Sequence, residues 1–313
     1  MRLIKKKTNI DFLSRTRRNF AVGFSVLIVL VSIASMATRG LNLGIDFTGG
    51  FLFQVQYPQT ADLVEIRQKL TAAGFGNHVV QDFGSEGEIL VRLPPLPGQE
   101  ANQIRDTVFA TLSGGDPDVI LQLFANVSAQ VGEELTEQGG LAMIFSLLMI
   151  FVYVMFRFQW KFAMGAVAAL THDVIVTVGF FSVFGIAFDL SVVAAVLAVI
   201  GYSLNDTVVA FDRIRENFAK LRGATPEQSM NTSINEMLAR TIITGVTTLI
   251  VLTALLLLGG ESVRPFSIAL IVGIVVGTYS SIYTASATAL MLHVTPQDLM
   301  PPETDPDLID DLP

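Results

Sequence analysis

Long runs of apolar residues alternate with charged segments along this chain. Six runs are long enough to cross a hydrocarbon core about 30 Å thick. They cover residues 20–38, 140–156, 162–184, 190–210, 241–258 and 266–292. The pattern predicts an α-helical polytopic membrane protein with six transmembrane helices. The first helix would be followed by a soluble segment at 39–138, and the other five would form a membrane bundle within 139–295.

The first apolar run also needs comparison with a signal peptide, because it follows a basic segment at 1–19. A cleavable signal has a shorter apolar core and a small-residue cleavage site. The run at 20–38 is longer than such a core, and no clear site of that kind precedes Arg39. We therefore expect an uncleaved membrane anchor.

The placement of Lys and Arg predicts the orientation in the membrane. Basic residues cluster in segment 1–19, in the connection at 157–161 and in the link at 211–239, whereas the opposite connections contain few. Short cytoplasmic loops carry the basic excess. We expect both termini in the cytoplasm, segment 39–138 in the periplasm, and the whole chain in a bacterial inner membrane. The acidic tail at 296–313 has the composition of a disordered segment.

The soluble segment alternates strand-like and helix-like patterns. Strands are expected at 44–57, 79–83, 89–93 and 119–127, and helices at 61–73 and 100–112. The order β-α-β-β-α-β is that of the split βαβ, ferredoxin-like plan. The segment is also acidic, which argues against nucleic acid as a partner.

The composition leaves little room for catalytic chemistry. The chain has no Cys and three His among 313 residues, so disulfides and thiolate metal sites are excluded and a histidine metal site is not expected. No P-loop, HExxH or GxSxG motif occurs. We expect no enzymatic activity and no cofactor or metal. Any work would draw on an ion gradient, such as a proton gradient, or on a partner.

A glycine-rich segment at 41–50, LNLGIDFTGG, follows the first apolar run. Glycine-rich segments can cradle phosphate, but this one lacks the Lys-Ser/Thr of a P-loop. We expect a tight turn into the first strand, where glycine allows a positive φ angle.

Three ionisable side chains within or at the edge of the predicted helices are functional candidates, because such groups are costly inside a membrane. Asp173 lies near the middle of the third helix, Asp206 in the inner half of the fourth, and Arg240 at the start of the fifth. Polar neighbours accompany them: Tyr202, Ser203, Asn205 and Thr207 on the fourth helix, and Thr244, Thr247 and Thr248 on the fifth. We expect these two stripes to face each other and to line a proton pathway through Asp206, Arg240 and Asp173.

Spacing alone leaves two interpretations of Asp206 and Arg240 open. Desolvation favours the neutral acid and a nearby guanidinium favours the carboxylate, so a small movement of Arg240 would load or release a proton. The alternative is a static ion pair between the fourth and fifth helices. His172 is expected to be a hydrogen-bonded packing residue rather than a relay member.

Small residues recur at every fourth position of the sixth helix and include Gly273, Gly277 and Ser281. Such a stripe allows close helix packing, either within this chain or with another subunit. The link at 211–239 contains two amphipathic segments, the second beginning with a capping-box pattern at 225–228. We expect two helices at the membrane surface there.

Several of these segments together resemble the SecD/SecF family within the resistance-nodulation-division superfamily. The segments are GIDFTGG at 44–50, THD at 171–173, GYSLNDT at 201–207 and DRIREN at 212–217. The resemblance implies partnership with SecD, and association with the SecYEG channel and YajC. It also implies use of the proton motive force to promote late, periplasmic-side steps of preprotein export. The family's proton-pathway aspartate and arginine correspond to Asp206 and Arg240.

Two other functions remain open. A half-transporter of the superfamily would export small molecules or lipids, but that role calls for a ligand cavity and a larger periplasmic domain. A purely structural translocon subunit would need Asp206 and Arg240 only for assembly. Six helices with one external domain are half of a twelve-helix transporter built from repeated halves. Without a second half, polar groups of the fourth to sixth helices would face lipid, so we expect a second half to cover them.

Overall fold

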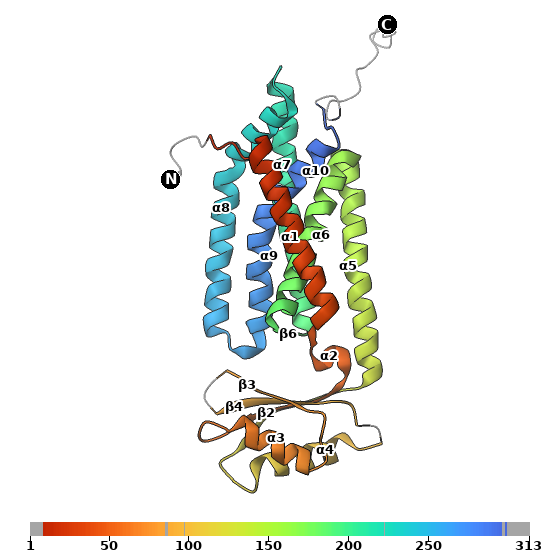
Figure 1. Cartoon of the computed structure of the whole chain (residues 1–313), viewed down its shortest axis with the longest axis vertical. Coiled ribbons are helices and arrows are strands. Elements are labelled where there is room, and N and C mark those ends of the chain that lie inside the picture. Colours follow the sequence, from red (N-terminus) through yellow and green to blue (C-terminus); the bar gives the residue numbers. More distant parts are fainter. Residues whose placement is uncertain (1–8, 85–86, 97, 222, 296–297, 299–313) are drawn as a thin grey trace, which may run out of the picture.

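The computed structural model describes residues 9–84, 87–96, 98–221, 223–295 and 298. Within these residues, six helices are long and apolar enough to cross a membrane. They form a bundle with a small sheet domain at one end (Figure 1). The predictions for residues 1–8 and for most of the tail at 296–313 lie outside the described residues.

Each of the first five predicted apolar runs lies within one helix, and these helices are longer than the runs. The bounds are α1 Arg15–Arg39, α5 Ala129–Arg157, α6 Trp160–Phe184, α7 Leu190–Lys220, α8 Pro226–Leu258, α9 Arg264–Ile282 and α10 Thr284–Met291. A short 3-10 turn, η1 Glu261–Val263, precedes α9. Hydropathy marks where a helix leaves the apolar layer, whereas the helix itself continues until a cap or a turn ends it.

The sixth predicted span consists of two helices, with α9 ending at Ile282 and α10 beginning at Thr284. Serine side chains before the break bond to the preceding turn of the same helix. Ser281 donates to the Thr278 carbonyl at 3.1 Å, and the Ser280 hydroxyl oxygen lies 3.2 Å from the Gly277 carbonyl oxygen. Such bonds compete with the helical ladder and bend helices.

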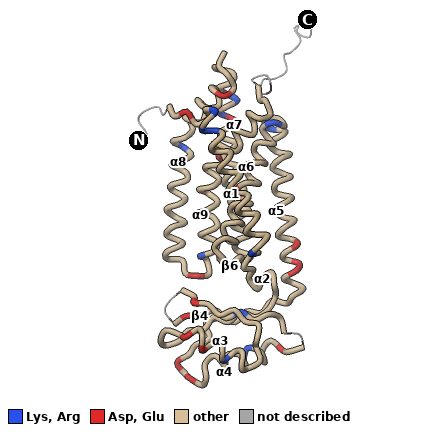
Figure 2. Tube along the Cα trace, viewed as in Figure 1, with Lys and Arg blue, Asp and Glu red and all other residues tan. Residues whose placement is uncertain are grey.

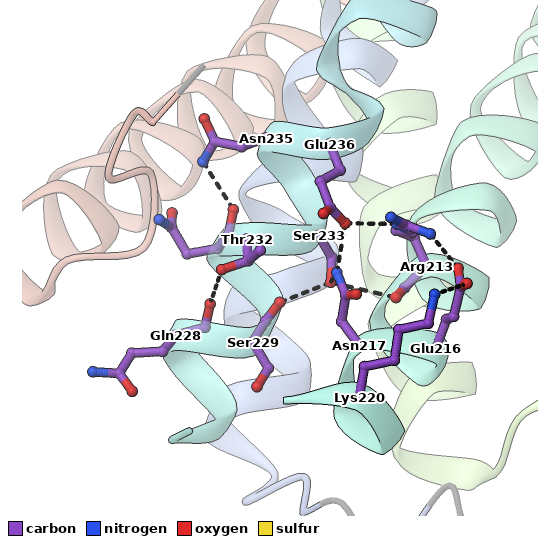
Figure 3. Close-up of polar contacts among 11 residues, drawn as sticks. Arg213, Glu216, Asn217, Lys220, Gln228, Ser229, Thr232, Ser233, Asn235 and Glu236 are labelled. Atoms are coloured by element: carbon purple, nitrogen blue, oxygen red, sulfur yellow. Dashed lines mark hydrogen bonds and ion pairs between the residues drawn. The ribbon is translucent and has the colours of Figure 1, made fainter. Parts of the chain in front are cut away.

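The link between the fourth and fifth spans differs from expectation, because its two amphipathic segments are the continuations of α7 and α8. Thr225 begins α8 with the expected capping box. Polar contacts then hold the two extensions together (Figure 3). Arg213 donates to Glu236 at 2.6 Å, and Asn217 donates to Ser233 at 3.0 Å and to Glu236 at 2.7 Å. Asn217 and Ser233 are buried, so these extensions form a packed hairpin.

The sheet domain (residues 50–127) has the expected order of elements. It contains β2 Gly50–Gln56, α3 Leu63–Ala72, β3 Val79–Asp82, β4 Glu88–Leu93, α4 Ala101–Ser113 and β5 Ile120–Val127. The strands are antiparallel neighbours in the order β3-β4-β2-β5. The helices α3 and α4 cover the face away from the bundle (Figure 1). Alternate residues Phe51, Phe53 and Val55 of β2 are buried in the domain core, as the period of a strand requires.

The glycine-rich segment contains a short helix, α2 Ile45–Thr48, where a turn into the first strand was expected. Positive φ angles occur at Gly49 (68°) and Gly50 (117°), which explains the need for glycine. Both glycines are also in tight contact with backbone. A Cβ on Gly49 would lie 2.7 Å from Ala129 Cα of α5, and one on Gly50 would lie 2.2 Å from the Leu93 carbonyl oxygen.

Gly132 completes this contact from the α5 side. A Cβ there would lie 2.6 Å from the Phe47 carbonyl oxygen and 2.9 Å from the Gly49 nitrogen. Gly132 has an ordinary helical conformation, so only this close approach requires glycine at that position. We predict that Gly132→Ala destabilises the protein by about 1–3 kcal/mol through overpacking.

The measurement is the thermal unfolding midpoint of the purified protein in detergent. Gly140→Ala is the matched control, because Gly140 lies on the same helix and a Cβ there would meet nothing within 4 Å. The control is expected to keep or raise the midpoint, since alanine favours a helix. Equal midpoints for the two variants would contradict the proposed contact.

Candidate functional site

Asp173, on α6, is fully buried at the meeting point of three helices. Its Oδ2 accepts hydrogen bonds from Ser203 of α7 at 2.6 Å and from Ser280 of α9 at 2.8 Å. Its Oδ1 lies 3.1 Å from Nδ1 of the neighbouring His172. One carboxyl group therefore joins α6, α7 and α9 in the interior of the bundle.

The small-residue stripe of α9 makes this meeting point possible. A Cβ on Gly273 would lie 2.2 Å from Val199 Cγ2 of α7, and one on Gly277 would lie 3.1 Å from Ser203 Cβ and 3.4 Å from Asp173 Oδ2. The stripe thus packs against α7 of the same chain, which resolves the alternative left open by the sequence. Ser281 is buried, but its hydroxyl bonds to its own helix.

Asp206 lies on α7 one turn after Ser203, and its exposed fraction is 5 %. Its Oδ2 has no hydrogen-bond partner within the described protein. The buried hydroxyls of Thr207 and Tyr202 on the same helix lack partners as well. Tyr202 points toward the neighbouring helices, since its hydroxyl lies 4.0 Å from the position of a Cβ on Gly245 of α8. Buried polar atoms without partners are costly and indicate a functional role.

Arg240 lies on α8, which packs against the helix α7 that carries Asp206. The two groups do not form an ion pair among the described residues, however, and Arg240 is exposed on the surface of this single chain. Asn205 of α7 and Thr247 of α8 are exposed too. The Arg240 guanidinium and the Asn205 amide lie on membrane-spanning helices, where contact with lipid is costly for such groups. We therefore expect another protein surface to cover them.

The threonine stripe of α8 does not reach across to α7 as expected. Thr244, Thr247 and Thr248 each donate to a carbonyl oxygen one turn earlier in their own helix, at 3.0, 2.9 and 2.9 Å. Threonine commonly bonds in this way when no other partner is near. Hydroxyl groups of α7 and α9 meet instead at Asp173. These threonine hydroxyls of α8 bond within their own helix and not to the polar residues of α7.

Two features of the site around Asp173 could not be singled out from the sequence. Ser280 adjoins Ser281, and only its position one turn after Gly277 hints that it faces α7. His172 contacts Asp173 as a packing residue would, but its Nε2 is buried without a partner. The arrangement gives the bundle two buried carboxyl groups, Asp173 bonded by hydroxyls and Asp206 with a free oxygen. Such groups can hold and release protons.

Comparison with protein families finds two matches that cover most of the chain. Residues 108–295 match the family described as protein export membrane protein SecD/SecF, C-terminal. Residues 34–61 match the SecD/SecF GG motif. The second match contains α2 and the two glycines that contact α5 and β4.

Curated relatives and solved structures agree with these matches. The protein translocase subunit SecF of Pseudomonas aeruginosa is 46% identical over 95% of this chain and 96% of its own length. The SecF subunit of Vibrio alginolyticus is 45% identical over 97% and 96%. The crystal structure of the translocon-associated membrane protein SecDF from Thermus thermophilus matches with a TM-score of 0.83 and 34% identity.

That match covers 94% of this chain and 40% of the SecDF chain. The chain thus spans nearly the whole length of the separate SecF subunits and less than half of the longer SecDF protein. The two family matches contain the glycine-rich segment and the spans from α5 onward. The chain therefore belongs to the SecD/SecF family of protein-export membrane proteins, in which it is a SecF-type subunit of the protein translocase.

Proposed function

We propose that this subunit works with SecD to convert the proton motive force into movement that promotes late, periplasmic-side steps of preprotein export. In this proposal the pair acts beside the SecYEG channel and YajC in the bacterial inner membrane. Protonation of Asp206 is the chemical step, and the sheet domain is the part that moves.

The charge distribution supports the orientation that this proposal requires. Lys and Arg gather at the end of the bundle opposite the sheet domain (Figure 2). By the positive-inside rule that end is cytoplasmic, so the sheet domain lies in the periplasm. The strand order β3-β4-β2-β5 with two helices on one face supports a ferredoxin-like, split βαβ domain.

The observation that carries the proposal is the buried carboxyl oxygen of Asp206 that has no hydrogen-bond partner among the described residues. A carboxylate fixed in a structural ion pair would have its oxygens engaged by that partner. This one has an oxygen free to take a proton. One charge crossing the membrane potential releases about 2.3 kcal/mol per 100 mV, which is enough to bias two conformations.

The exposed polar groups of α7 and α8 support a second half of the machine. Arg240, Asn205 and Thr247 are exposed on this chain alone, and exposure of such groups to acyl chains is costly. A helix bundle contributed by SecD would cover this face and supply partners for the guanidinium. Arg240 would then lie between the two halves, where movement of one half against the other changes its distance from Asp206.

We predict that Asp206→Asn abolishes gradient-dependent export, because an amide cannot exchange a proton, while leaving assembly with SecD intact. Export of a preprotein into inner-membrane vesicles, with the gradient imposed or collapsed, is the measurement. The matched control is Asp212→Asn on the same helix, where the carboxylate is exposed and pairs with Arg157 at 2.9 Å. The control should export normally. Full gradient-dependent export by Asp206→Asn would refute the proposal.

A second prediction concerns Asp173 and compares two adjacent serines of α9. Ser280→Ala removes a donor from a fully buried carboxyl group and is expected to cost about 1–3 kcal/mol. Ser281→Ala removes a hydroxyl that bonds to its own helix, so it should cost much less. Thermal unfolding midpoints of the two purified variants provide the comparison. If Ser281→Ala is the more damaging, Asp173 does not hold the three helices together as described.

A further inference from the structure

The start of α7 is bonded to the segment that leads into the sheet domain. Asp46 of α2 accepts a hydrogen bond at its Oδ2 from the Leu190 nitrogen, the first residue of α7, at 3.0 Å. Asp189 caps the same helix by accepting from the Val192 nitrogen at 3.1 Å. Two carboxylates therefore face the positive end of the helix that carries Asp206.

The backbone beside Asp46 is paired with the turn before α7. Strand β1 Asn42–Leu43 lies parallel to β6 Ala187–Phe188, and the Gly44 nitrogen donates to the Phe188 carbonyl at 2.8 Å. A Cβ on Gly44 would lie 3.3 Å from Asp189 Cβ. The approach is close enough that the two segments cannot slide past each other without breaking contacts.

Side-chain packing adds an apolar anchor to this joint. Phe47 of α2 is buried in a cluster with residues of α6, α7 and α9, including Phe181, Val192 and Ala269. Its ring lies 5.8 Å from that of Phe188. Thus α2 is packed into the bundle although it belongs to the segment that enters the sheet domain.

The same segment is fixed to the sheet on its other side. Gly50 begins β2, directly after α2, and pairs with Val127 of β5. Arg92 of β4 donates to the Leu43 carbonyl oxygen at 3.3 Å. Burial lowers the pKa of the Arg92 guanidinium from its ordinary value, while the carboxylate of Asp189 raises it. The opposing influence of Asp189 places Arg92 of the sheet within electrostatic reach of the start of α7.

We propose that Asp46 is the positioning residue that couples α7 to β2, so that displacement of α7 by the proton cycle is passed to the sheet domain. The proposal rests on the proposed function, since it needs α7 to move when Asp206 changes protonation. Asp46 does not touch the proton. It holds the end of the moving helix against the segment that begins the sheet.

The coupling role makes a prediction that a purely structural role does not. Asp46→Ala removes the acceptor for the Leu190 nitrogen, so only the β1–β6 pairing and the packing of Phe47 still hold the start of α7 to this segment, and displacement of α7 is passed to β2 less completely. Proton uptake should persist while export loses its response to the gradient. Loss of a hydrogen bond to a charged group shifts the equilibrium between the coupled and uncoupled states of α7 and β2 about tenfold. We therefore expect the gradient-dependent gain in export to fall about tenfold.

The experiment uses the subunit in complex with SecD, at matched levels of assembly. Proton uptake is followed with a pH-sensitive dye inside proteoliposomes, and export is followed in inner-membrane vesicles with and without a gradient. Asp46→Asn keeps an acceptor oxygen and should lose less export than Asp46→Ala. If the alanine variant does not assemble while the asparagine variant does, the contact is needed for assembly itself and the coupling role is overturned.

Asp62→Ala is the matched control. Asp62 is also an aspartate at a helix N-terminus and accepts from the Val64 nitrogen at 2.8 Å, but it caps α3 within the sheet domain. Its loss should leave both proton uptake and export unchanged.

The outcomes separate this inference from the proposed function. Normal gradient-dependent export by Asp46→Ala would overturn the coupling role, and so would parallel loss of proton uptake and export in an assembled complex. An unmutated complex that takes up no protons and exports equally with and without a gradient would instead contradict the proposed function.

Discussion

The interior of this bundle depends on one constraint, that a carboxyl group inside a membrane protein must find its partners within the protein. Asp173 meets it through Ser203, Ser280 and His172, which come from three helices. The close packing of α7 and α9 over Gly273 and Gly277 brings those hydroxyls within reach. Because Asp173 is satisfied in this way and Asp206 is not, the two buried acids have different physical roles. The first is bonded to three helices, and in the proposed function the second is the group that takes up the proton.

The helix that carries Asp206 is also joined to the sheet domain, as the proposed coupling requires. Asp206 lies in the middle of α7, and Asp46 and β1 hold the start of that helix to the first strand of the sheet. The glycines of the GG motif are explained by this joint, because Gly49 and Gly50 have positive φ angles and leave no room for side chains. The glycine-rich segment at 41–50 thus forms a tight connection between α1 and β2.

Much of this architecture follows from the sequence. Hydropathy located all six spans, and the alternation of residues in 44–127 gave the order of strands and helices. The sequence did not reveal that α7 and α8 continue past the membrane, since charge marks the membrane surface and not the end of a helix. Helical spacing also places residues on a common face without fixing how that face is turned toward its neighbours. For this reason Ser203 and Asp206 were predicted together, whereas Ser280 was missed and the outward position of Arg240 was not expected.

Direct observation of the proton on Asp206 tests the central claim most closely. Infrared difference spectroscopy on the complex with SecD, recorded as the external pH is lowered, reports the carbonyl stretch of a protonated carboxylic acid. The account predicts that such a band appears in the unmutated complex and is missing from Asp206→Asn. A band that persists unchanged in Asp206→Asn, or the absence of any carboxylic acid band in the unmutated complex, would contradict it.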